Sequence, residues 1–386
     1  MARRIKHQDM SRRNRAEVLS LIRRTGALSR MQLAQQLRLS PAALTKIASE
    51  LLEAGILRQE PVLDLSPSQP RALLNLNPDW GHVLTVSITY NLAVGIVDLS
   101  GKVVEMSRLA GDDGTHDLYR DSFEDLLLPA VRRLLERWGT NGVFGIGVLS
   151  YGTVDRNGVI LDNSELPDKN VDIRRVLSGV TKLPVYVDEE SRLLLLARQW
   201  SRAKPLSTAV AISCRMSGFG GNQALLINGR LHYGLRGLAG EPGWAVPVPH
   251  LPETWNAAMA AVGRMGGKEA YLEKLGQGAP EALNVYRLSI ENFGYRVALM
   301  ANLINPEAVF LFTDYLTLGE PFLDGVMEEA RKHAAPMNLE GMQLLFGGRR
   351  SDEERLAAAA LPVLAQVFEE GLFDALPKTV SLGTTG

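Results

Sequence analysis

Two helix starts that lie close together near the N-terminus place the strongest constraint on the fold of this chain. Ser29 stands three residues before Gln32, which is the spacing of a capping box, and apolar residues at helical spacing follow it. Ser40 and Pro41 form a second start, because serine is a good N-cap and proline fits the first helical position. The sequence therefore predicts two short helices joined by a tight turn.

The segments on either side of this pair complete a small domain. A longer helix is predicted from about Asn14 to Thr25, where Gly26 ends it. The helix that starts at Pro41 ends at Gly55 and carries a buried stripe made of Leu44, Ile47, Ala48 and Leu51. Strands over 56–62 and 73–76, with a loop between them, predict a wing. We expect residues 1–76 to form a winged helix-turn-helix domain of the α+β class.

The charges of the chain are divided between this domain and the rest. Residues 1–60 hold 12 Lys and Arg against 5 Asp and Glu, whereas the remainder holds 30 against 38. Such a division is typical of a basic domain that meets a polyanion and an acidic body that does not. A solvated basic tail or a protein-binding three-helix module are the alternatives. The helix pattern and the charge together favour binding of DNA.

The helix after Pro41 leaves small, polar and basic residues pointing outward near its N-terminus, as entry into the major groove requires. Because this type of domain is normally used twice, we expect a homodimer or a higher homo-oligomer on a two-fold site. The residues expected to contact double-stranded operator DNA are Arg30, Arg38, Ser40, Pro41, Ala42, Ala43, Thr45, Lys46 and the wing residue Arg71.

Residues 77–386 read as a body in which strands alternate with helices, in two α/β lobes of about 77–190 and 191–386. The 46% hydrophobic content supports a folded body of this size. Its longest apolar runs fall far short of the roughly 18 residues that a membrane span needs, so we expect no membrane insertion. The single cysteine, Cys214, allows no internal disulfide. No signal peptide is evident, and we expect a cytoplasmic protein.

Several short strings, in this order, carry a resemblance to a known family. They include Gln69 to Leu74, Val97 to Lys102, Gly145 to Val148 with Gly152 to Asp155, Leu183 to Val187, Ile227 to Arg230, Gly240 to Gly243, and Asn305 to Glu307. Together with the helix-turn-helix strings, the order resembles the transcriptional-regulator branch of the ROK family (repressor, open reading frame, kinase). The resemblance implies an ASKHA-type body (sugar kinase, Hsp70, actin) with a sugar between its lobes.

Departures from the family pattern argue against catalysis. Family kinases hold ATP with an Asp-x-Gly-x-Thr loop, and this place reads Ser87 to Asn91 here, without the acid or the glycine. The second phosphate loop retains Gly218, Gly220 and Gly221, but Phe219 stands where a small hydroxyl is expected. We therefore expect no enzyme and no cofactor. We also expect no zinc, because the family's cysteines are missing and Trp244 replaces its histidine.

The resemblance also implies a ligand site in the body. Carried over by position, the ligand-binding residues are Glu165, Glu189, Glu190, Glu241 and Trp244. Carboxylates that share one cleft repel acidic ligands, and an indole offers a flat face to a sugar ring or an ammonium group. We expect a neutral or amine-bearing sugar as effector, unless these glutamates are merely solvated in a decayed site.

These observations predict a sequence-specific DNA-binding transcriptional regulator, a repressor of carbohydrate-related genes that a small sugar-like ligand modulates. Two alternatives stay open. One is a sugar kinase with an accessory DNA-binding domain, and the other is a regulator whose body senses a protein partner.

Overall fold

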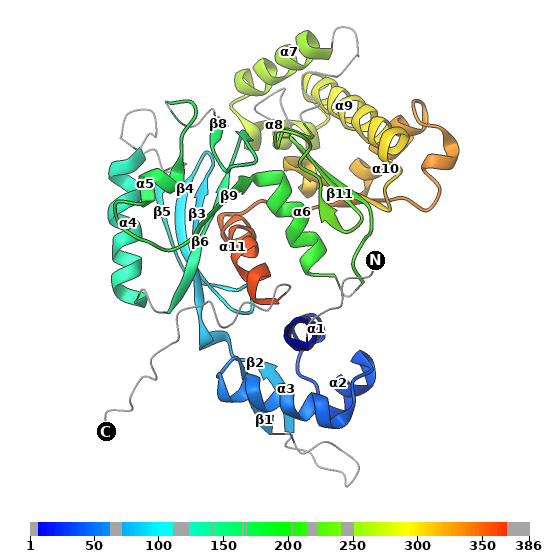
Figure 1. The fold of residues 1–386 in the computed structure, drawn as a ribbon. Coiled ribbons are helices and arrows are strands. Elements are labelled where there is room, and N and C mark those ends of the chain that lie inside the picture. The colour runs from blue at the N-terminus through cyan, green and yellow to red at the C-terminus, as the bar shows by residue number, and fades with distance from the viewer. Residues whose placement is uncertain are drawn as a thin grey trace.

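The computed structural model describes residues 7–61, 72–110, 123–139, 142–163, 166, 168–202, 204–214, 222–240 and 251–368. Figure 1 shows three parts: a small N-terminal unit at the bottom, and above it two regions that are each built on a β-sheet. The first sheet has the strand order β5-β4-β3-β6-β9, and the second has the order β12-β11-β10-β13-β14.

The N-terminal unit consists of α1 (His7–Thr25), α2 (Arg30–Leu37), α3 (Pro41–Glu53) and the antiparallel strands β1 (Leu57–Pro61) and β2 (Ala72–Leu76). Both predicted helix starts are confirmed. The Ser29 hydroxyl accepts from the Gln32 N–H over 3.2 Å while the Gln32 side chain accepts from the Ser29 N–H over 2.9 Å. Ser40 caps α3 by accepting from the Ala43 N–H, also over 3.2 Å. The predicted stripe of α3 is buried.

The first sheet follows a short 3-10 turn, η1 (Pro78–Trp80). Its strands are β3 (His82–Ile88), β4 (Leu92–Asp98), β5 (Val103–Ala110), β6 (Val143–Ser150) and β9 (Val185–Glu189). The helix α4 (Phe123–Trp138) covers one face, and α5 (Ile173–Leu177) with the small hairpin β7 (Thr153–Val154) and β8 (Ile160–Asp162) lies beyond β6. β3, β4 and β6 are buried along their whole length, as strands covered on both faces must be.

The second sheet is made of β10 (Ala209–Cys214), β11 (Gln223–Ile227), β12 (Arg230–Leu231), β13 (Ala308–Thr313) and β14 (Gln343–Phe346). Its outer face carries α7 (Leu251–Arg264), α8 (Lys268–Gly276), α9 (Pro280–Ile304) and α10 (Glu320–Arg331), with the 3-10 turns η3 (Asp314–Leu318) and η4 (Pro336–Asn338). Two separate helices, α7 and α8, cover residues 251–276. Gly266 and Gly267, with φ of 102° and 93°, separate them, because this conformation suits glycine and interrupts a helix.

Two helices occupy the space between the sheets: α6 (Glu190–Trp200) and α11 (Asp352–Phe368). The helix α11 comes from the C-terminal end of the described chain but packs on the first sheet. It lies so close to β6 that a Cβ added at Gly147 would be 1.8 Å from the Ala359 carbonyl oxygen. The leucines of α6 pack against the second sheet and against α11. The pair therefore separates the two halves of the body.

The N-terminal unit is fixed to the first sheet at η1. The Trp80 indole N–H donates to the Ala54 carbonyl over 2.7 Å, and its ring packs on Phe144 with the centroids 4.8 Å apart. The Phe144 ring occupies the space beside Gly81 where a side chain would otherwise lie. Among the described residues, no helix combines the length and the apolar character needed to cross a bilayer.

Candidate functional site

The first candidate site is the outward face of α3. Because Leu44, Ile47, Ala48 and Leu51 face the core, the opposite side of the helix points to solvent. Pro41, Ala42, Thr45 and Lys46 are exposed there, and Ala43 is partly exposed. The Thr45 hydroxyl donates to the Pro41 carbonyl over 2.8 Å. The structure thus brings most of the residues predicted to contact DNA onto one free face, which begins at the Ser40 cap.

The predicted arginines lie at both ends of α2. With the Gln59 amide oriented so that its oxygen faces Arg30, the guanidinium donates to it over 2.8 Å, so Arg30 joins α2 to the strand β1. Arg38 is exposed and ends α2 in a left-handed conformation with φ of 54°. Arg71 lies outside the described residues.

The second candidate site lies where the strands of the two sheets end. The strands β3, β6 and β9 run parallel, as do β10 and β13, and ligands of open α/β sheets bind at the carboxyl ends of such strands. Loops at this edge touch across the two halves, since the Asn222 amide donates to the Gly152 carbonyl over 2.6 Å. The buried hydroxyl of Ser87 and the buried amide of Gln223 have no hydrogen-bond partner in the part of the chain that the structure describes.

Glu190, predicted as a ligand-binding residue, is fully buried in ion pairs. Its Oε1 accepts from the Arg355 Nε over 2.7 Å, and the Arg350 Nε lies 3.5 Å away. Burial lowers the pKa of Arg355, but attraction from Glu190 and contact with Tyr90 outweigh it and raise the pKa above its usual value. The negative charge of Glu190, which was expected to face a ligand, is therefore balanced by two arginines.

Arg355 belongs to a wider group of charges. Asp352, at the start of α11, accepts from the Asn91 amide over 3.2 Å and from the Arg108 Nη2 over 2.6 Å, and it lies 3.6 Å from Arg355. We call this group the inter-sheet charge cluster; it consists of Asn91, Arg108, Glu190, Arg350, Asp352 and Arg355. The cluster joins the turn after β3 and the edge strand β5 to both central helices.

Glu189 caps the start of α6. Its carboxylate accepts from the backbone N–H of Ser191 over 2.9 Å and of Arg192 over 3.3 Å. Burial raises the pKa of Glu189 to about 7, against the opposing attraction of Arg192. This carboxylate therefore serves the helix start, and a role in ligand binding stays a prediction.

Asp188, which is not among the residues predicted to bind a ligand, ties the two halves of the body together. Its Oδ1 lies 2.6 Å from the Arg192 Nε, and its Oδ2 accepts from the Tyr233 hydroxyl over 2.8 Å. Burial and the nearby Asp188 charge raise the pKa of Tyr233. No sequence signal marks Tyr233. No sequence signal marks Arg355 either, because a charged residue beside the apolar run Leu356 to Leu361 can equally lie on the exposed face of a helix.

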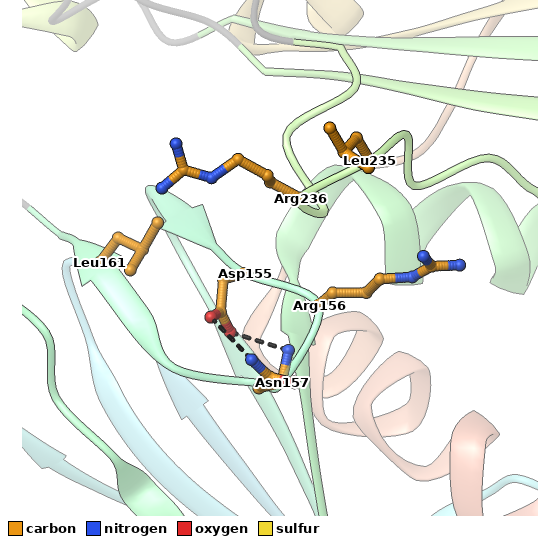
Figure 2. A pocket seen from close by; sticks show the side chains of 6 residues that line it. All are labelled: Asp155, Arg156, Asn157, Leu161, Leu235 and Arg236. Carbon is orange, nitrogen blue, oxygen red and sulfur yellow. Dashed lines mark hydrogen bonds between the residues drawn. The ribbon is translucent and has the colours of Figure 1, made fainter.

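Two cavities open beside this region. One of about 370 Å³ is lined by Tyr186, Asp188 and Tyr233 among others, and one of about 420 Å³ lies between the turn after β7 and the segment at Leu235. Figure 2 shows the second cavity, where Asp155 is occupied by hydrogen bonds to Asn157 and the Arg156 and Arg236 guanidinium groups point away from each other. The polar groups of this cavity therefore do not converge on one point.

Comparison with known proteins settles the family. The model of the ROK family matches residues 89–341. The chain belongs to the ROK family. Its relatives include a xylose repressor of Caldicellulosiruptor bescii, 23% identical over 363 residues, which is 83% of this chain and 88% of that protein. Another is the DNA-binding transcriptional dual regulator NagC of Escherichia coli, 25% identical over 237 residues, which is 60% of this chain and 56% of that protein.

Solved ROK structures share the fold. A ROK family transcriptional regulator, described as a homolog of the E. coli MLC protein, superposes with a TM-score of 0.71 at 19% identity, covering 96% of this chain and 99% of that chain. A ROK family glucokinase from Streptomyces griseus, solved with glucose and AMPPNP, gives 0.55 at 19% identity, covering 73% of this chain and 99% of that chain. The predicted sugar-kinase-like fold of the body is confirmed.

The turn after β3, where the resemblance implies the phosphate loop of family kinases, is engaged by charged residues of this chain. Asn91 lies in the turn where the Asp-x-Gly-x-Thr loop was expected, and it is bound to Asp352. The Tyr90 ring in the same turn lies 4.9 Å from the Arg355 guanidinium carbon. The residues of this turn thus contact Asp352 and Arg355 of α11.

Part of the predicted ROK ligand site lies outside the described residues: Glu165, Glu241, Trp244 and the glycine loop 218–221. Among the described residues, no group of three or more His, Cys, Asp or Glu side chains is placed to hold a metal ion.

Proposed function

We propose that this ROK protein is a sequence-specific DNA-binding transcriptional repressor whose body binds a small sugar-like effector. Its relatives named as a xylose repressor and as a DNA-binding transcriptional regulator support this assignment, and they align over most of the chain. The single observation that carries it is the free face of α3 on an N-terminal unit whose charge is strongly positive.

The N-terminal unit is proposed to be a winged helix-turn-helix domain that ends at residue 76. In this proposal, Ser40 to Ala43, Thr45 and Lys46 enter the major groove, because small residues at a helix start allow the backbone to approach the base edges. Arg30, Arg38 and the wing residue Arg71 lie near phosphates or the minor groove. Two copies of the chain present two such domains to a two-fold operator.

The body is proposed to be a sensor, with no kinase activity. A general base must be free to accept the proton of a sugar hydroxyl, and the Glu190 carboxylate is engaged by Arg355 and Arg350 instead. A coupled assay of sugar-dependent ATP consumption separates this proposal from the kinase alternative. Turnover by the pure protein would establish the kinase.

The effector is proposed to be a neutral or amine-bearing sugar. With Glu190 balanced by arginines, Glu165 and Glu241 are the carboxylates left to repel an acidic ligand, and Trp244 offers a ring face. A thermal-shift series with D-xylose, N-acetylglucosamine, glucosamine, glucose and glucose 6-phosphate tests this, since a ligand of the folded state raises the melting temperature. Stronger stabilisation by the sugar phosphate than by its neutral parent would contradict the proposal.

Selection of duplex DNA by the full chain, followed by mobility shifts, tests the DNA-binding role. Lys46→Ala should weaken binding to the selected duplex by about 1 to 3 kcal/mol or reduce its salt dependence, according to whether Lys46 contacts a base or a phosphate. Lys102→Ala removes an equal charge from an exposed turn of the body and should bind as the wild type does. Equal affinities of the Lys46 variant and the wild type at all salt concentrations would exclude this face.

A further inference from the structure

The central helices α6 and α11 run from the inter-sheet charge cluster to the N-terminal unit. Each helix begins in the cluster, α6 with Glu190 and α11 with Asp352. Each ends against α1, α6 with Trp200 and α11 with Phe368. The helix α11 has 17 residues and is therefore about 25 Å long, so the pair connects two distant parts of the molecule. Figure 1 shows both helices above α1.

At the upper end the two helices are joined by a buried ion pair. The Arg355 Nε donates to the Glu190 Oε1 over 2.7 Å, and each side chain is 1% exposed. Separating two such charges in the interior is costly, because each would be left without its partner. This ion pair therefore fixes how the first turn of α6 lies against the first turn of α11.

At the lower end one residue of α1 joins the two helices. The Arg23 guanidinium donates to the Trp200 carbonyl over 2.7 Å, and its central carbon lies 3.7 Å from the centroid of the Trp200 ring. The same carbon is 5.7 Å from the Phe368 ring. The Ser20 hydroxyl adds a hydrogen bond of 2.8 Å to the Phe368 carbonyl. A cation at the carboxyl ends of two helices is also favoured by their dipoles.

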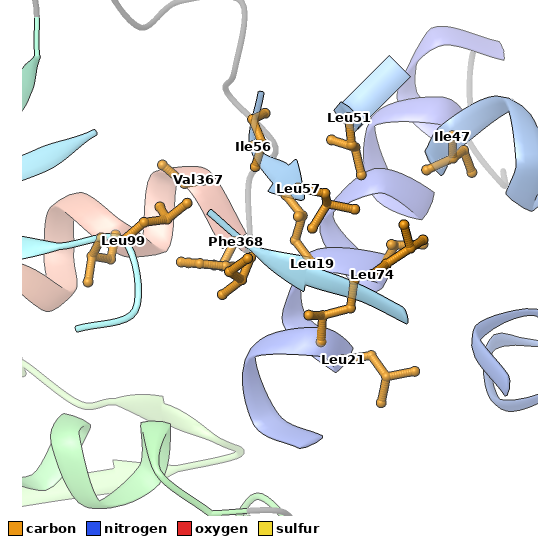
Figure 3. Packing of buried hydrophobic residues seen from close by; sticks show 14 of the residues in the cluster. Leu19, Leu21, Ile47, Leu51, Ile56, Leu57, Leu74, Leu99, Val367 and Phe368 are labelled. Carbon is orange, nitrogen blue, oxygen red and sulfur yellow. The ribbon is translucent and has the colours of Figure 1, made fainter. Parts of the chain in front are cut away.

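A continuous apolar core surrounds this contact. Leu19 of α1 is fully buried in the same cluster as Val367 and Phe368 of α11, and Figure 3 shows these side chains packed between the two parts. Leu57 and Leu74 of the strands β1 and β2 belong to that cluster too. The end of α11 is thus part of the core of the N-terminal unit, and a shift of its last turn displaces that core.

The two helices contact the two halves of the body differently, although α6 also follows β9 of the first sheet directly and packs on α11. The close approach of Gly147 to Ala359 holds α11 on the first sheet. The leucines Leu193, Leu194 and Leu195 of α6 pack with residues of the second sheet. Because the ion pair joins their first turns, a change in the closure of the two halves would displace mainly the far ends of α6 and α11 relative to each other, and Arg23 contacts both helices at that end.

We propose that α6 and α11 couple the inter-sheet charge cluster to the N-terminal unit, and that Arg23 is the positioning residue that transmits their relative displacement to α1. The inference rests on the proposed function, because it names how the effector site regulates that unit. Coupling between two sites is reciprocal, so DNA bound to the N-terminal unit must also change the stability of the inter-sheet charge cluster.

Hydrogen exchange of the full-length protein, with and without the selected duplex, tests the coupling. In the wild type, DNA should slow exchange in peptides that cover 190–193 and 352–356 by about fivefold or more. Arg23→Ala should abolish this distant protection, and Arg23→Lys, which keeps the charge but not the planar contact with Trp200, should retain part of it. Arg24→Ala is the matched control. Arg24 is the exposed neighbour, and within the described part of the chain its side chain donates only to the Ser20 carbonyl of its own helix, so its loss should leave the distant protection unchanged.

A second measurement needs no DNA. Asp352→Asn keeps the size of the side chain but removes its charge, and it should speed exchange of α1 residues 16–25 when Arg23 is present and not when Arg23 is alanine. The coupling would be overturned if DNA slowed hydrogen exchange only in residues 7–76, or if the Arg23→Ala and Arg24→Ala variants showed the same distant protection. A wild-type protein that selects no DNA would instead refute the proposed function, while the Asp352 measurement would still decide the coupling.

Discussion

The buried ion pair between Glu190 and Arg355 leads to a prediction about the free energy of unfolding. The size of the effect follows from the burial of the two side chains. Both side chains are 1% exposed, and their contact is a single short hydrogen bond of 2.7 Å between charged groups. Arg355→Met keeps the length of the side chain and leaves the Glu190 charge with the more distant Arg350 Nε at 3.5 Å. Glu190→Gln removes the nearer carboxylate of Arg355, which keeps Asp352 at 3.6 Å, and removes the carboxylate beside Arg350.

The cost of each change follows from burial. Removing one partner of a buried ion pair costs roughly 3 to 5 kcal/mol, because the remaining charge stays out of water. Arg350 stays close enough to Glu190 to place Arg355→Met at the lower end, about 3 kcal/mol. In the variant that combines Glu190→Gln with Arg355→Met, neither of the two charges remains. Its loss of free energy of unfolding should therefore be smaller than the sum of the losses in the two single variants, by about 1 to 3 kcal/mol.

Urea unfolding of the four proteins, followed by circular dichroism, measures this cycle. The control is Arg287→Met, since the ion pair of Arg287 with Glu291 lies on the surface with 61% and 37% exposure, and its loss should change the free energy of unfolding by about 0.5 kcal/mol or less. If Arg355→Met cost no more than this control, or if the single costs summed to the double cost, the buried ion pair would not have the role assigned to it.

Three further outcomes follow from the same structure. Gly147→Ala should lower the free energy of unfolding by about 1 to 3 kcal/mol or more, because its Cβ would lie 1.8 Å from the Ala359 carbonyl oxygen. Gly263→Ala is the control for urea unfolding, and it should be tolerated because no atom lies within 4 Å of the added Cβ. The pKa of Glu189 is raised to about 7 in the folded state from 4.5, so its contribution to stability is present at low pH and is lost as the pH rises through 7. Glu189→Gln should remove this loss, and unfolding midpoints that fall equally in both proteins between pH 5 and pH 8 would contradict it. Ser40→Ala should destabilise α3 by about 1 kcal/mol in thermal unfolding, and no change would mean that the cap contributes nothing.

Local chemistry explains why the N-terminal unit could be predicted closely. The capping residues Ser29 and Ser40 act on N–H groups only three residues away, so their effect is written in neighbouring sequence. The buried stripe of α3 follows from helical periodicity in the same way. The strands β3, β4 and β6 were also recognisable, since they are mostly apolar runs. The strand β14, with four residues and no alternation, was missed because so short a run resembles a loop.

Contacts between distant segments could not be predicted. Arg355 and Glu190 are separated by 165 positions, and Arg23 and Trp200 by 177. Which side chains meet over such separations depends on how helices pack on sheets, and no local rule encodes that. The resemblance to the ROK family indicated where a ligand would lie, but it did not indicate that Arg350 and Arg355 would reach the same place.

Three consecutive acidic residues separate what is local in the sequence from what depends on packing. The amino-acid sequence establishes that Asp188, Glu189 and Glu190 follow a strand and precede a helix, and from this alone each could face a ligand. In the folded protein, Asp188 pairs with Arg192 and Tyr233, Glu189 caps α6, and Glu190 meets Arg355. Successive residues at a strand end point in different directions, so each carboxylate meets a different environment, and burial makes each take whatever donor that environment supplies. The residue types are local information, but the partners are fixed only by tertiary packing.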